Sequence, residues 1–274
     1  MKFADLHLHT VYSDGTYTPA QLIAASKKAK MSAIAIVDHD TVEAIQPSLA
    51  IAQKEEIELV PGIELTAELD GSEVHILGYF IDYRSGRLLE QLEILKSNRI
   101  QRVHKMTQKL KELNIEISPE EIFALAQEGT VGRLHVARAM VLKGAVSCIA
   151  EAFKKYLGDK GPAYVCGFRF TPKEAIALIK GEGGIPVLAH PYSLFNDDLI
   201  PAFVDDGIMG LEVYYPEHSQ STINYYLGLA KKYNLLVTGG SDCHGDAKPD
   251  VPVGLSKVPY ELVEELKNAK ERLS

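Results

Sequence analysis

The sequence lacks the features that mark several classes of protein. Its three cysteines, Cys148, Cys166 and Cys243, are odd in number and form no C-x-x-C pair. This pattern argues against a disulfide framework or a zinc ribbon and favours a reducing compartment. No apolar run approaches the roughly 18 residues that a membrane helix needs, and no charged and apolar leader opens the chain. We therefore expect a cytoplasmic protein without membrane association.

Basic residues are also in deficit. The chain carries 29 lysines and arginines against 37 aspartates and glutamates, a formal net charge of −8. A protein that coats nucleic acid would carry a basic excess, so this class is disfavoured. A nucleotide or the end of a nucleic acid stays open as a substrate, because recognition of one end needs only a local site.

The chain does contain a regular alternation of strand and helix patterns. Its 274 residues, 46% hydrophobic and 24% charged, suffice for one large α/β domain or for a barrel with an insertion. Short apolar runs bounded by turn residues are typical of strands buried on both faces of a parallel sheet. The expected strands cover residues 2–7, 33–37, 57–66, 73–81, 185–189, 209–213 and 235–239.

Helical patterns separate these strands and also fill the middle of the chain. Thr18 is a suitable N-cap for a helix over 19–30 that has Pro19 at its first position. Because strands and helices alternate on both sides of the helical middle, we expect residues 1–86 and 166–274 to form a closed or nearly closed parallel barrel. Residues 87–165 are expected to form a helical insertion. The remaining expected helices cover 42–55, 87–114, 119–128, 133–142, 147–157, 172–181, 220–233 and a last segment from about residue 260.

Histidine and carboxylate residues recur at the ends of the expected strands. His7 and His9 are two residues apart, so they point to the same face of the first strand. Neutral imidazole is the commonest metal ligand, and β/α barrels build their active sites where the strands end. The sequence therefore predicts a metal site whose candidate ligands are His7, His9, Asp14, His39, Glu64, His75, His190, Asp242 and His244.

These residues lie in motifs that together resemble one family over essentially the whole chain. The motifs are Asp5-Leu6-His7-Leu8-His9-Thr10, Ser13-Asp14-Gly15, Asp38-His39-Asp40, Pro61-Gly62-Ile63-Glu64, His75-Ile76-Leu77-Gly78-Tyr79, Ala189-His190-Pro191 and Gly240-Ser241-Asp242-Cys243-His244. They resemble the PHP (polymerase and histidinol phosphatase) family of metal-dependent phosphoesterases, and no position of the combined motif is missing.

The resemblance implies a distorted seven-stranded β/α barrel with three divalent metal ions. It implies catalytic roles for Glu64, which would bridge two ions, and for Asp242. The implied ligand sets are His7, His9, Glu64 and Asp242 for one ion, Asp14, His39 and His244 for a second, and Glu64, His75 and His190 for a third.

The ligand types alone agree with this implication. Six imidazoles and three carboxylates without a thiolate suit Mn²⁺, Zn²⁺ or Fe²⁺. Three divalent ions would bring +6 against −3 from the carboxylates, and the remaining charge of about +3 would attract a phosphate dianion. Metal ions about 3.5–4 Å apart can generate hydroxide and clamp the oxygens of an in-line displacement. Phosphoester hydrolysis is the reaction that this chemistry favours.

Substrate-binding candidates lie in and around the insertion. Residues 87–112 carry seven basic and three acidic side chains, a local charge of +4. Arg99 and Arg102 lie in a string that resembles a recurring one in the family, and Arg133 and His135 begin a helix, where free N–H groups favour an anion. His218 follows a strand end and is a candidate contact for the leaving group. The alternative for each is an ordinary solvated side chain.

Four further residues flank the candidate ligands. Alternation along the strand should turn the sulfur of Cys243 away from its neighbours, so we expect a spacer. Asp5, Asp38 and Asp40 could fix imidazole tautomers as acceptors or could simply cap the barrel end. The sequence does not choose between these two roles.

The leading hypothesis is a stand-alone metal-dependent phosphoesterase that acts on a small phosphorylated compound or on a nucleic-acid end. Its length and helical insertion resemble the branch of the family that acts on nucleoside 3′,5′-bisphosphates and on 5′-phosphorylated oligonucleotide ends. Histidinol phosphate phosphatase is the second candidate, and an amidohydrolase-type C–N hydrolase the third. A non-catalytic, metal-stabilised interaction module is the alternative from another class. No stable protein partner is implied.

Overall fold

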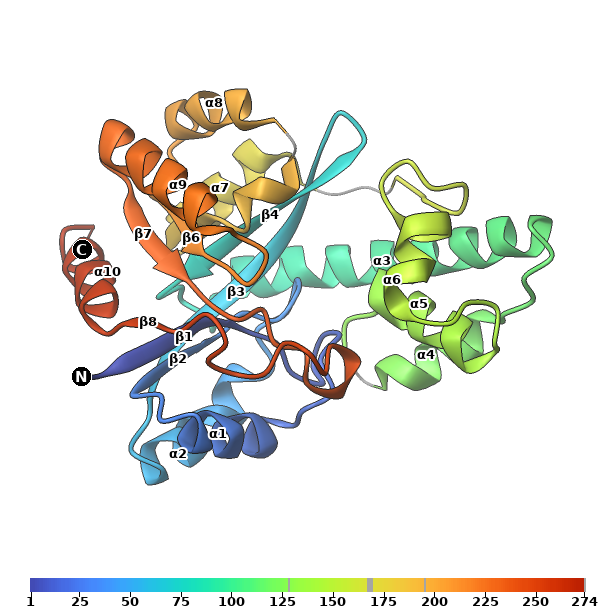
Figure 1. The fold of residues 1–274 in the computed structure, drawn as a ribbon, viewed down its shortest axis with the longest axis horizontal. Coiled ribbons are helices and arrows are strands. Elements are labelled where there is room, and N and C mark those ends of the chain that lie inside the picture. Colours follow the sequence, from blue (N-terminus) through green and yellow to red (C-terminus); the bar gives the residue numbers. More distant parts are fainter. Residues whose placement is uncertain (128, 167–169, 195, 274) are drawn as a thin grey trace.

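The computed structural model describes residues 1–127, 129–166, 170–194 and 196–273, and one sheet lies at its centre (Figure 1). All seven expected strands are present, together with a short eighth. The strands are β1 (Phe3–Leu8), β2 (Ala33–Ile36), β3 (Glu58–Leu69), β4 (Ser72–Tyr79), β5 (Ile185–Leu188), β6 (Gly210–Tyr214), β7 (Leu236–Gly239) and β8 (Val258–Pro259).

The helices fall into those that cover the sheet and those of the middle segment. Thr18 caps the first helix as expected, by accepting a hydrogen bond from the backbone of Gln21. The predicted bounds of α5, α7 and α9 are confirmed. The helices are α1 (Pro19–Lys28), α2 (Ile45–Lys54), α3 (Gly86–Glu112), α4 (Pro119–Ala126), α5 (Arg133–Leu142), α6 (Ile149–Ala152), α7 (Pro172–Gly181), α8 (Ile200–Asp205), α9 (Gln220–Tyr233) and α10 (Glu261–Glu271).

Some expected bounds differ from the observed ones. The helix expected over 147–157 divides into α6 and a π-helical turn at Phe153–Leu157, and the expected end of α4 at residue 128 lies outside the described residues. The short helix α8 was not predicted. No helix in the described part of the chain is long and apolar enough to cross a membrane.

The sheet is a nearly closed barrel in the order β7-β6-β5-β4-β3-β2-β1-β8. The expectation of an all-parallel barrel is wrong at β4, which runs antiparallel to both β3 and β5. The reason is the two-residue connection Asp70-Gly71, where both residues have positive φ values of 51° and 79°. Such a connection can only join antiparallel neighbours.

The eighth strand and the segment after β7 complete the barrel around β1. β8 pairs antiparallel with the start of β1, with Ala4 opposite Val258. At the other end of β1, the backbone N–H of His9 donates to the carbonyl of Cys243 (3.1 Å) and that of Asp242 donates to the carbonyl of His7 (2.8 Å). The first and last parts of the chain therefore meet at the carboxyl end of β1.

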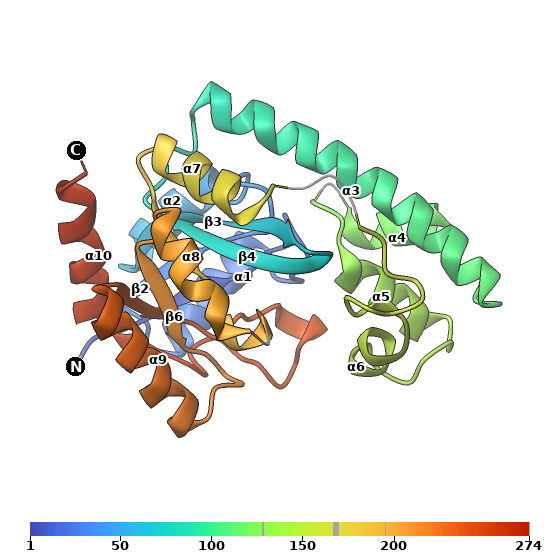
Figure 2. The same cartoon turned by 90° about the horizontal axis from the view of Figure 1, so that it is seen from above.

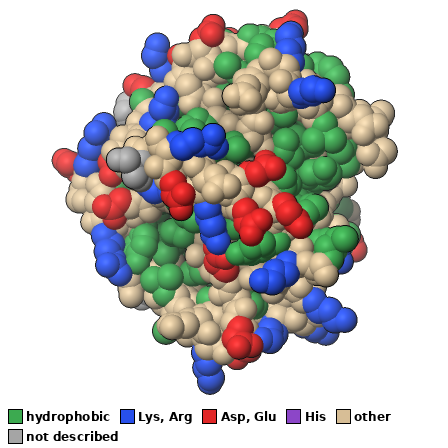
Figure 3. All heavy atoms as spheres, turned by 90° about the vertical axis from the view of Figure 1, so that its left-hand side faces the viewer, with side chains coloured by type: hydrophobic (Ala, Val, Ile, Leu, Met, Phe, Trp, Pro, Cys, Tyr) green, Lys and Arg blue, Asp and Glu red, His purple; other side chains and the backbone are tan. Residues whose placement is uncertain are grey.

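The barrel interior is apolar at one end and polar at the other. Ala4 and Leu6 of β1 pack inside with alternate residues of neighbouring strands, and α10 closes that end of the barrel through Val263 and Leu266. Figure 3 shows the outside of this end, where basic and acidic side chains are interspersed with hydrophobic ones. The polar end lies opposite, where the parallel strands finish.

An irregularity in β1 sets which of its side chains reach the polar end. The register with β2 shifts between Asp5 and Leu8. Leu6 lies in the barrel core, whereas Leu8 packs outside against α1, together with Leu22 and Ile23. Strict alternation would have put Leu6 and Leu8 on one face, so the shift turns His7 and His9 inward. Strand irregularities next to active sites commonly re-aim side chains in this way.

Helix α3 connects the barrel to a separate group of helices (Figures 1 and 2). Its first half packs Leu88, Leu92 and Leu95 on the core outside the barrel. Its second half packs Val103, Met106 and Leu110 on α4 and α5 in a hydrophobic cluster of their own. One continuous helix thus holds the helices of residues 119–157 beside the polar end of the barrel.

Candidate metal centre

Candidate ligands from seven parts of the chain meet at the polar end of the barrel. His7 lies near the carboxyl end of β1, His39 follows β2, Glu64 lies within β3, and His190 follows β5. His75 reaches the same end from inside β4, because that strand runs in the opposite direction. Asp14 comes from the loop after β1, and Asp242 and His244 from the segment after β7.

Glu64 lies at the centre of the cluster and is 1% exposed. One or other of its carboxylate oxygens lies 2.9–3.2 Å from a ring nitrogen of five histidines. The rings of these histidines form a closed circuit, with centroids of neighbours 4.7–5.9 Å apart. In order around the circuit they are His7, His9, His39, His75 and His190.

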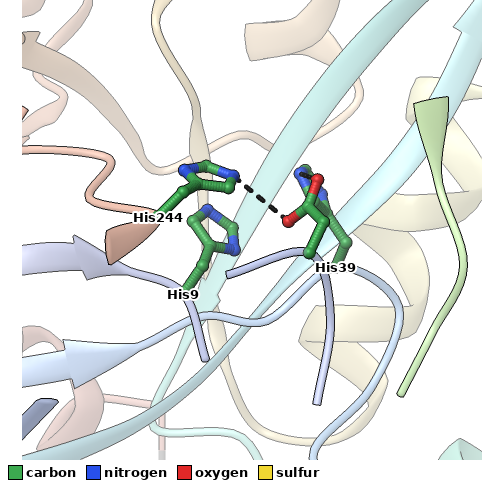
Figure 4. Close-up of side chains that lie close together, drawn as sticks. His9, His39 and His244 are labelled. Carbon is green, nitrogen blue, oxygen red and sulfur yellow. Dashed lines mark ion pairs between the residues drawn. The ribbon is translucent and has the colours of Figure 1, made fainter. Parts of the chain in front are cut away.

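A second concentration of ligand atoms surrounds His9 and His244. Figure 4 shows the side chains of His9, His39 and His244 converging. His244 Nε2 lies 3.1 Å from Asp14 Oδ1. The rings of His9 and His244 stack with centroids 4.2 Å apart. Asp242 Oδ1 lies 3.1 Å from His9 Nε2 and 3.5 Å from His244 Nδ1.

The described residues offer three groups of side chains whose ligand atoms lie within 4.8 Å of one another. They overlap with the ligand sets implied by the family resemblance but are not identical to them. Glu64 is absent from the group of His7, His9 and Asp242, where it was expected. His9 joins the second group in addition to the first, and His39 stands in the third group where His190 was expected. The groups are His7, His9 and Asp242; His9, Asp14, His39 and His244; and His39, Glu64 and His75.

Buried nitrogen and oxygen atoms without hydrogen bonds are the feature of the cluster that fits a bound metal. Asp14 Oδ1, His39 Nδ1 and His75 Nδ1 are buried and make no hydrogen bond to any described residue. Each nevertheless faces an opposing ligand atom at 2.9–3.2 Å. Burying polar atoms without hydrogen bonds is costly, and cations placed between them would satisfy them all. Nitrogen and oxygen donors without sulfur fit first-row divalent ions.

The protonation of the metal-free cluster follows from its carboxylates. Burial would lower the pKa of His7, but Glu212, Glu64 and Asp242 outweigh it and raise that pKa well above its usual value. Burial would also lower the pKa of His9 and of His75, but nearby carboxylates outweigh it and raise both values to about 9. Burial would raise the pKa of Glu64, yet the surrounding imidazoles hold it well below its usual range. The carboxylates therefore favour positive charge at His7, His9 and His75, which bound cations would also supply.

Glu212 orients two of the candidate ligands, and sequence analysis missed it. Its Oε1 lies 2.8 Å from Nδ1 of His7, and its Oε2 accepts a hydrogen bond from the backbone of His190 at 2.8 Å. The residue is fully buried in β6. A charged residue inside the otherwise apolar strand Gly210–Tyr214 was the signal that could have revealed it.

The aspartates beside the histidines cap the barrel end. Asp38 accepts hydrogen bonds from Thr10 and Ser13, and Asp5 accepts them from Ser241 and the backbone of Gly254. These bonds hold loops, as the capping role predicts, and Asp40 likewise accepts from the backbone of Thr66. The hydroxyl of Ser13 that donates to Asp38 also lies 3.5 Å from Nδ1 of His9, so Asp38 reaches one imidazole through Ser13. Cys243 packs in the core with Leu8, which confirms that it is a spacer.

Lys248 and Tyr215 are further side chains at the cluster that the sequence did not single out. The ammonium of Lys248 and the hydroxyl of Tyr215 each donate to Asp242 Oδ2 at 2.9 Å. Lys248 lies in an ordinary polar loop, where nothing in the local sequence distinguishes it from a surface lysine.

A cavity of about 990 Å³ opens above the cluster. Its walls include the cluster residues His39, Glu64 and Asp242 and, across from them, residues 147–150 and Phe153 of the helical segment. This volume is at the upper end of the range for small-molecule sites and accommodates a nucleotide.

The three predicted arginines line this cavity and are held by carboxylates. Arg99 donates to Asp40 (2.7 Å) and to Thr66 (2.7 Å). Arg102 pairs with Glu73 at 2.9 Å. Arg133 pairs with Glu73 as well and with Asp159 at 2.7 Å.

The two predicted histidines are placed differently. His135 is 1% exposed, accepts a hydrogen bond from the backbone of Gly132 and is not part of the cavity wall. Burial lowers the pKa of His135 to about 4, so it is neutral. His218 bonds the carbonyl of Val213 through Nδ1 (2.8 Å) and lies behind Tyr215, also outside the wall. Substrate contact by these histidines stays a prediction.

Comparison with known proteins gives consistent matches over the whole chain. The PHP domain matches residues 5–158. The 5′-3′ exoribonuclease Rnm of Escherichia coli (strain K12) is 33% identical over 98% of this chain and 96% of its own length. The 3′,5′-nucleoside bisphosphate phosphatase of Chromobacterium violaceum is 29% identical over 91% of this chain and 90% of its own. A solved structure from Bifidobacterium adolescentis, described as a candidate metal-dependent phosphoesterase, has a TM-score of 0.88 at 30% identity, covering 96% of this chain and 94% of that chain.

Proposed function

This chain belongs to the PHP domain family and is a metal-dependent phosphoesterase, and from that premise we propose a substrate class. We propose that it removes the 3′-phosphate from nucleoside 3′,5′-bisphosphates and trims 5′-phosphorylated oligonucleotides from that end. The relatives named as an exoribonuclease and as a bisphosphate phosphatase support this class. Their enzymatic roles speak against the non-catalytic interaction module.

One observation carries the proposal: a single cavity is lined both by the cluster of ligand side chains and by arginines. A substrate with two phosphates would place one at the cluster and the other at Arg133 or Arg102. Holding the remote phosphate would fix the reacting one in position and convert binding energy into rate. The helical segment 87–165 would act as the insertion that covers this site, since α3 and α5 supply those arginines.

We further propose that the cluster holds three divalent ions, Mn²⁺, Zn²⁺ or Fe²⁺, on the nine candidate ligands. When bound, such ions would supply water activation and charge neutralisation for the displacement. Glu64 is suited to bridge ions because both of its oxygens face imidazoles. Glu212 would keep His7 in one tautomer and orientation. Hydrolysis of a bisphosphate would consume water and release a 5′-mononucleotide and inorganic phosphate. Trimming of an oligonucleotide would consume water and release a 5′-mononucleotide and a shortened chain that carries the new 5′-phosphate.

The first prediction concerns the anchor phosphate. Adenosine 3′,5′-bisphosphate should be hydrolysed with kcat/KM about 10- to 150-fold above adenosine 3′-monophosphate, because a charge-assisted contact contributes roughly 1.5–3 kcal/mol. Phosphate release from the two compounds measures this ratio. Arg133→Ala should reduce the ratio, whereas Arg87→Ala, whose side chain is 69% exposed on α3, should leave it unchanged.

Two results would contradict the proposed substrate class. Equal kcat/KM for the two adenosine compounds would show that no site binds the second phosphate as an anchor. A clear preference for histidinol phosphate would instead promote histidinol phosphate phosphatase, which the same cluster could support.

A further inference from the structure

Lys248 occupies a fixed position on the cavity wall. It follows a 3-10 turn, Gly245–Ala247, four residues after the candidate ligand His244. Gly245 has a φ of 61°, and a Cβ there would lie 2.4 Å from Thr16 Oγ1, so the turn packs closely on the loop after β1. The backbone of Asp246 also donates to Thr16 Oγ1 at 2.7 Å. The turn that carries Lys248 is therefore held in place.

The two carboxylate oxygens of Asp242 have different partners. Oδ1 faces the imidazoles of His7 and His9 at 3.4 and 3.1 Å. Oδ2 accepts from Lys248 and from Tyr215, each at 2.9 Å. One oxygen thus belongs to the cluster, and the other anchors the ammonium beside it.

The ammonium of Lys248 has fewer hydrogen-bond partners among the described residues than the guanidinium groups of the arginines. Each arginine is held by carboxylates and by a further oxygen: the hydroxyl of Thr66 for Arg99, the carbonyl of Val165 for Arg102 and the carbonyl of Leu157 for Arg133. Lys248 has one partner among the described residues, Asp242, which accounts for one of its three N–H donors. Its side chain keeps 34% of its surface accessible and contributes to the cavity wall. The remaining donors therefore face the space that a substrate would fill.

We propose that Lys248 contacts a non-bridging oxygen of the phosphoryl group that is cleaved, with Asp242 holding it for that contact. The inference rests on phosphoester hydrolysis at this cluster and not on the identity of the substrate's second phosphate. A fixed positive group beside the reacting phosphoryl group stabilises the charge that develops there and needs no reorganisation during the reaction. Lys248 is anchored next to a candidate ligand, which puts its donors beside the place where that group would bind.

The test compares Lys248→Met and Lys248→Arg with wild type, using p-nitrophenyl phosphate as substrate and inorganic phosphate as competitive inhibitor. Lys248→Met should lower kcat/KM by roughly a hundredfold. It should also weaken inhibition by phosphate about tenfold or more, while elemental analysis finds unchanged metal content per chain. Lys248→Arg, which keeps the charge, should recover much of the phosphate binding. Lys231→Met, on the exposed last turn of α9, is the control and should match wild type.

Two outcomes would overturn the inference. An unchanged phosphate inhibition constant in Lys248→Met would show that the lysine does not contact phosphate. Loss of metal together with activity, with no rescue by Lys248→Arg, would show that it acts only by holding Asp242. Neither outcome bears on the ratio between bisphosphate and monophosphate, so failure of this inference and failure of the proposed substrate class are separate results.

Discussion

Glu212 makes its contacts with residues that are distant in the sequence and that the closed barrel brings close to it. It lies 205 residues from His7, yet their side chains are 2.8 Å apart. Its second oxygen accepts from the backbone of His190, so one carboxylate orients candidate ligands from two different strands. Partners of this kind fix the tautomer and the ring orientation of metal-binding histidines.

Glu212→Gln is expected to weaken divalent metal binding by about 10–100-fold, because the amide keeps the size of the side chain but not its charge. Titration of the chelator-treated protein with Mn²⁺ or Zn²⁺ measures the change. Glu265→Gln, on the exposed face of α10, serves as the matched control. Wild-type metal affinity in Glu212→Gln would show that the hydrogen bond to His7 does not matter for binding.

At the scale of elements, α3 and α5 are joined to the barrel through β4. Glu73, near the start of β4, pairs with Arg102 of α3 and with Arg133 of α5. All three side chains are at most 15% exposed, so the pairs are weakly screened by water. This contact ties the helical segment to the hairpin of β3 and β4 on one side of the cavity.

Glu73→Gln should lower the free energy of unfolding by about 3 kcal/mol, because it leaves two buried guanidinium groups without their shared carboxylate. Hydrogen exchange should increase first in α5 and in the second half of α3, and less in the barrel strands. Chemical denaturation with exchange mass spectrometry measures both effects. Glu116→Gln, at an exposed position between α3 and α4, should change neither. Uniform exchange over the whole chain would contradict a local tie.

At the scale of the whole molecule, the cluster couples stability to pH and to metal. In the metal-free protein the pKa of His7 is raised, and those of His9 and His75 are raised to about 9, by carboxylates that outweigh burial. Raised values stabilise the fold fully below the unfolded pKa of about 6.5, and this contribution is lost as pH rises toward 9. Burial lowers the pKa of His39 and of His244, so their contribution changes only below about 6.5.

Chelator-treated protein should therefore lose thermal stability between pH 6.5 and 9. Metal binding needs neutral imidazoles, so added Mn²⁺ or Zn²⁺ should release protons in this range, and its affinity should rise with pH. Unfolding midpoints with and without metal, together with calorimetric titration in buffers of different ionisation enthalpy, measure these trends. Parallel pH profiles for the metal-free and metal-loaded protein would contradict the coupling.

The sequence by itself determined the presence of seven strands, the bounds of three helices and the set of candidate ligands. Continuous apolar runs predict buried strands, and caps such as Thr18 define helix starts through local hydrogen bonds. The motifs around His7, His39 and Asp242 also indicated the PHP family, which the comparisons confirm. All of these features depend on residues close together in the chain, so they can be recognised without knowing the fold.

Only the tertiary structure decided which side chains act together. The inward turn of His7 and His9 follows from a register shift against β2, which no local pattern in β1 shows. Lys248 reaches Asp242 because the turn that carries it packs on the loop after β1. Glu212 and Glu73 join elements far apart in sequence. Charge pairs and hydrogen bonds of this kind depend on distances of about 3 Å, which are set by the closure of the barrel and not by any local pattern.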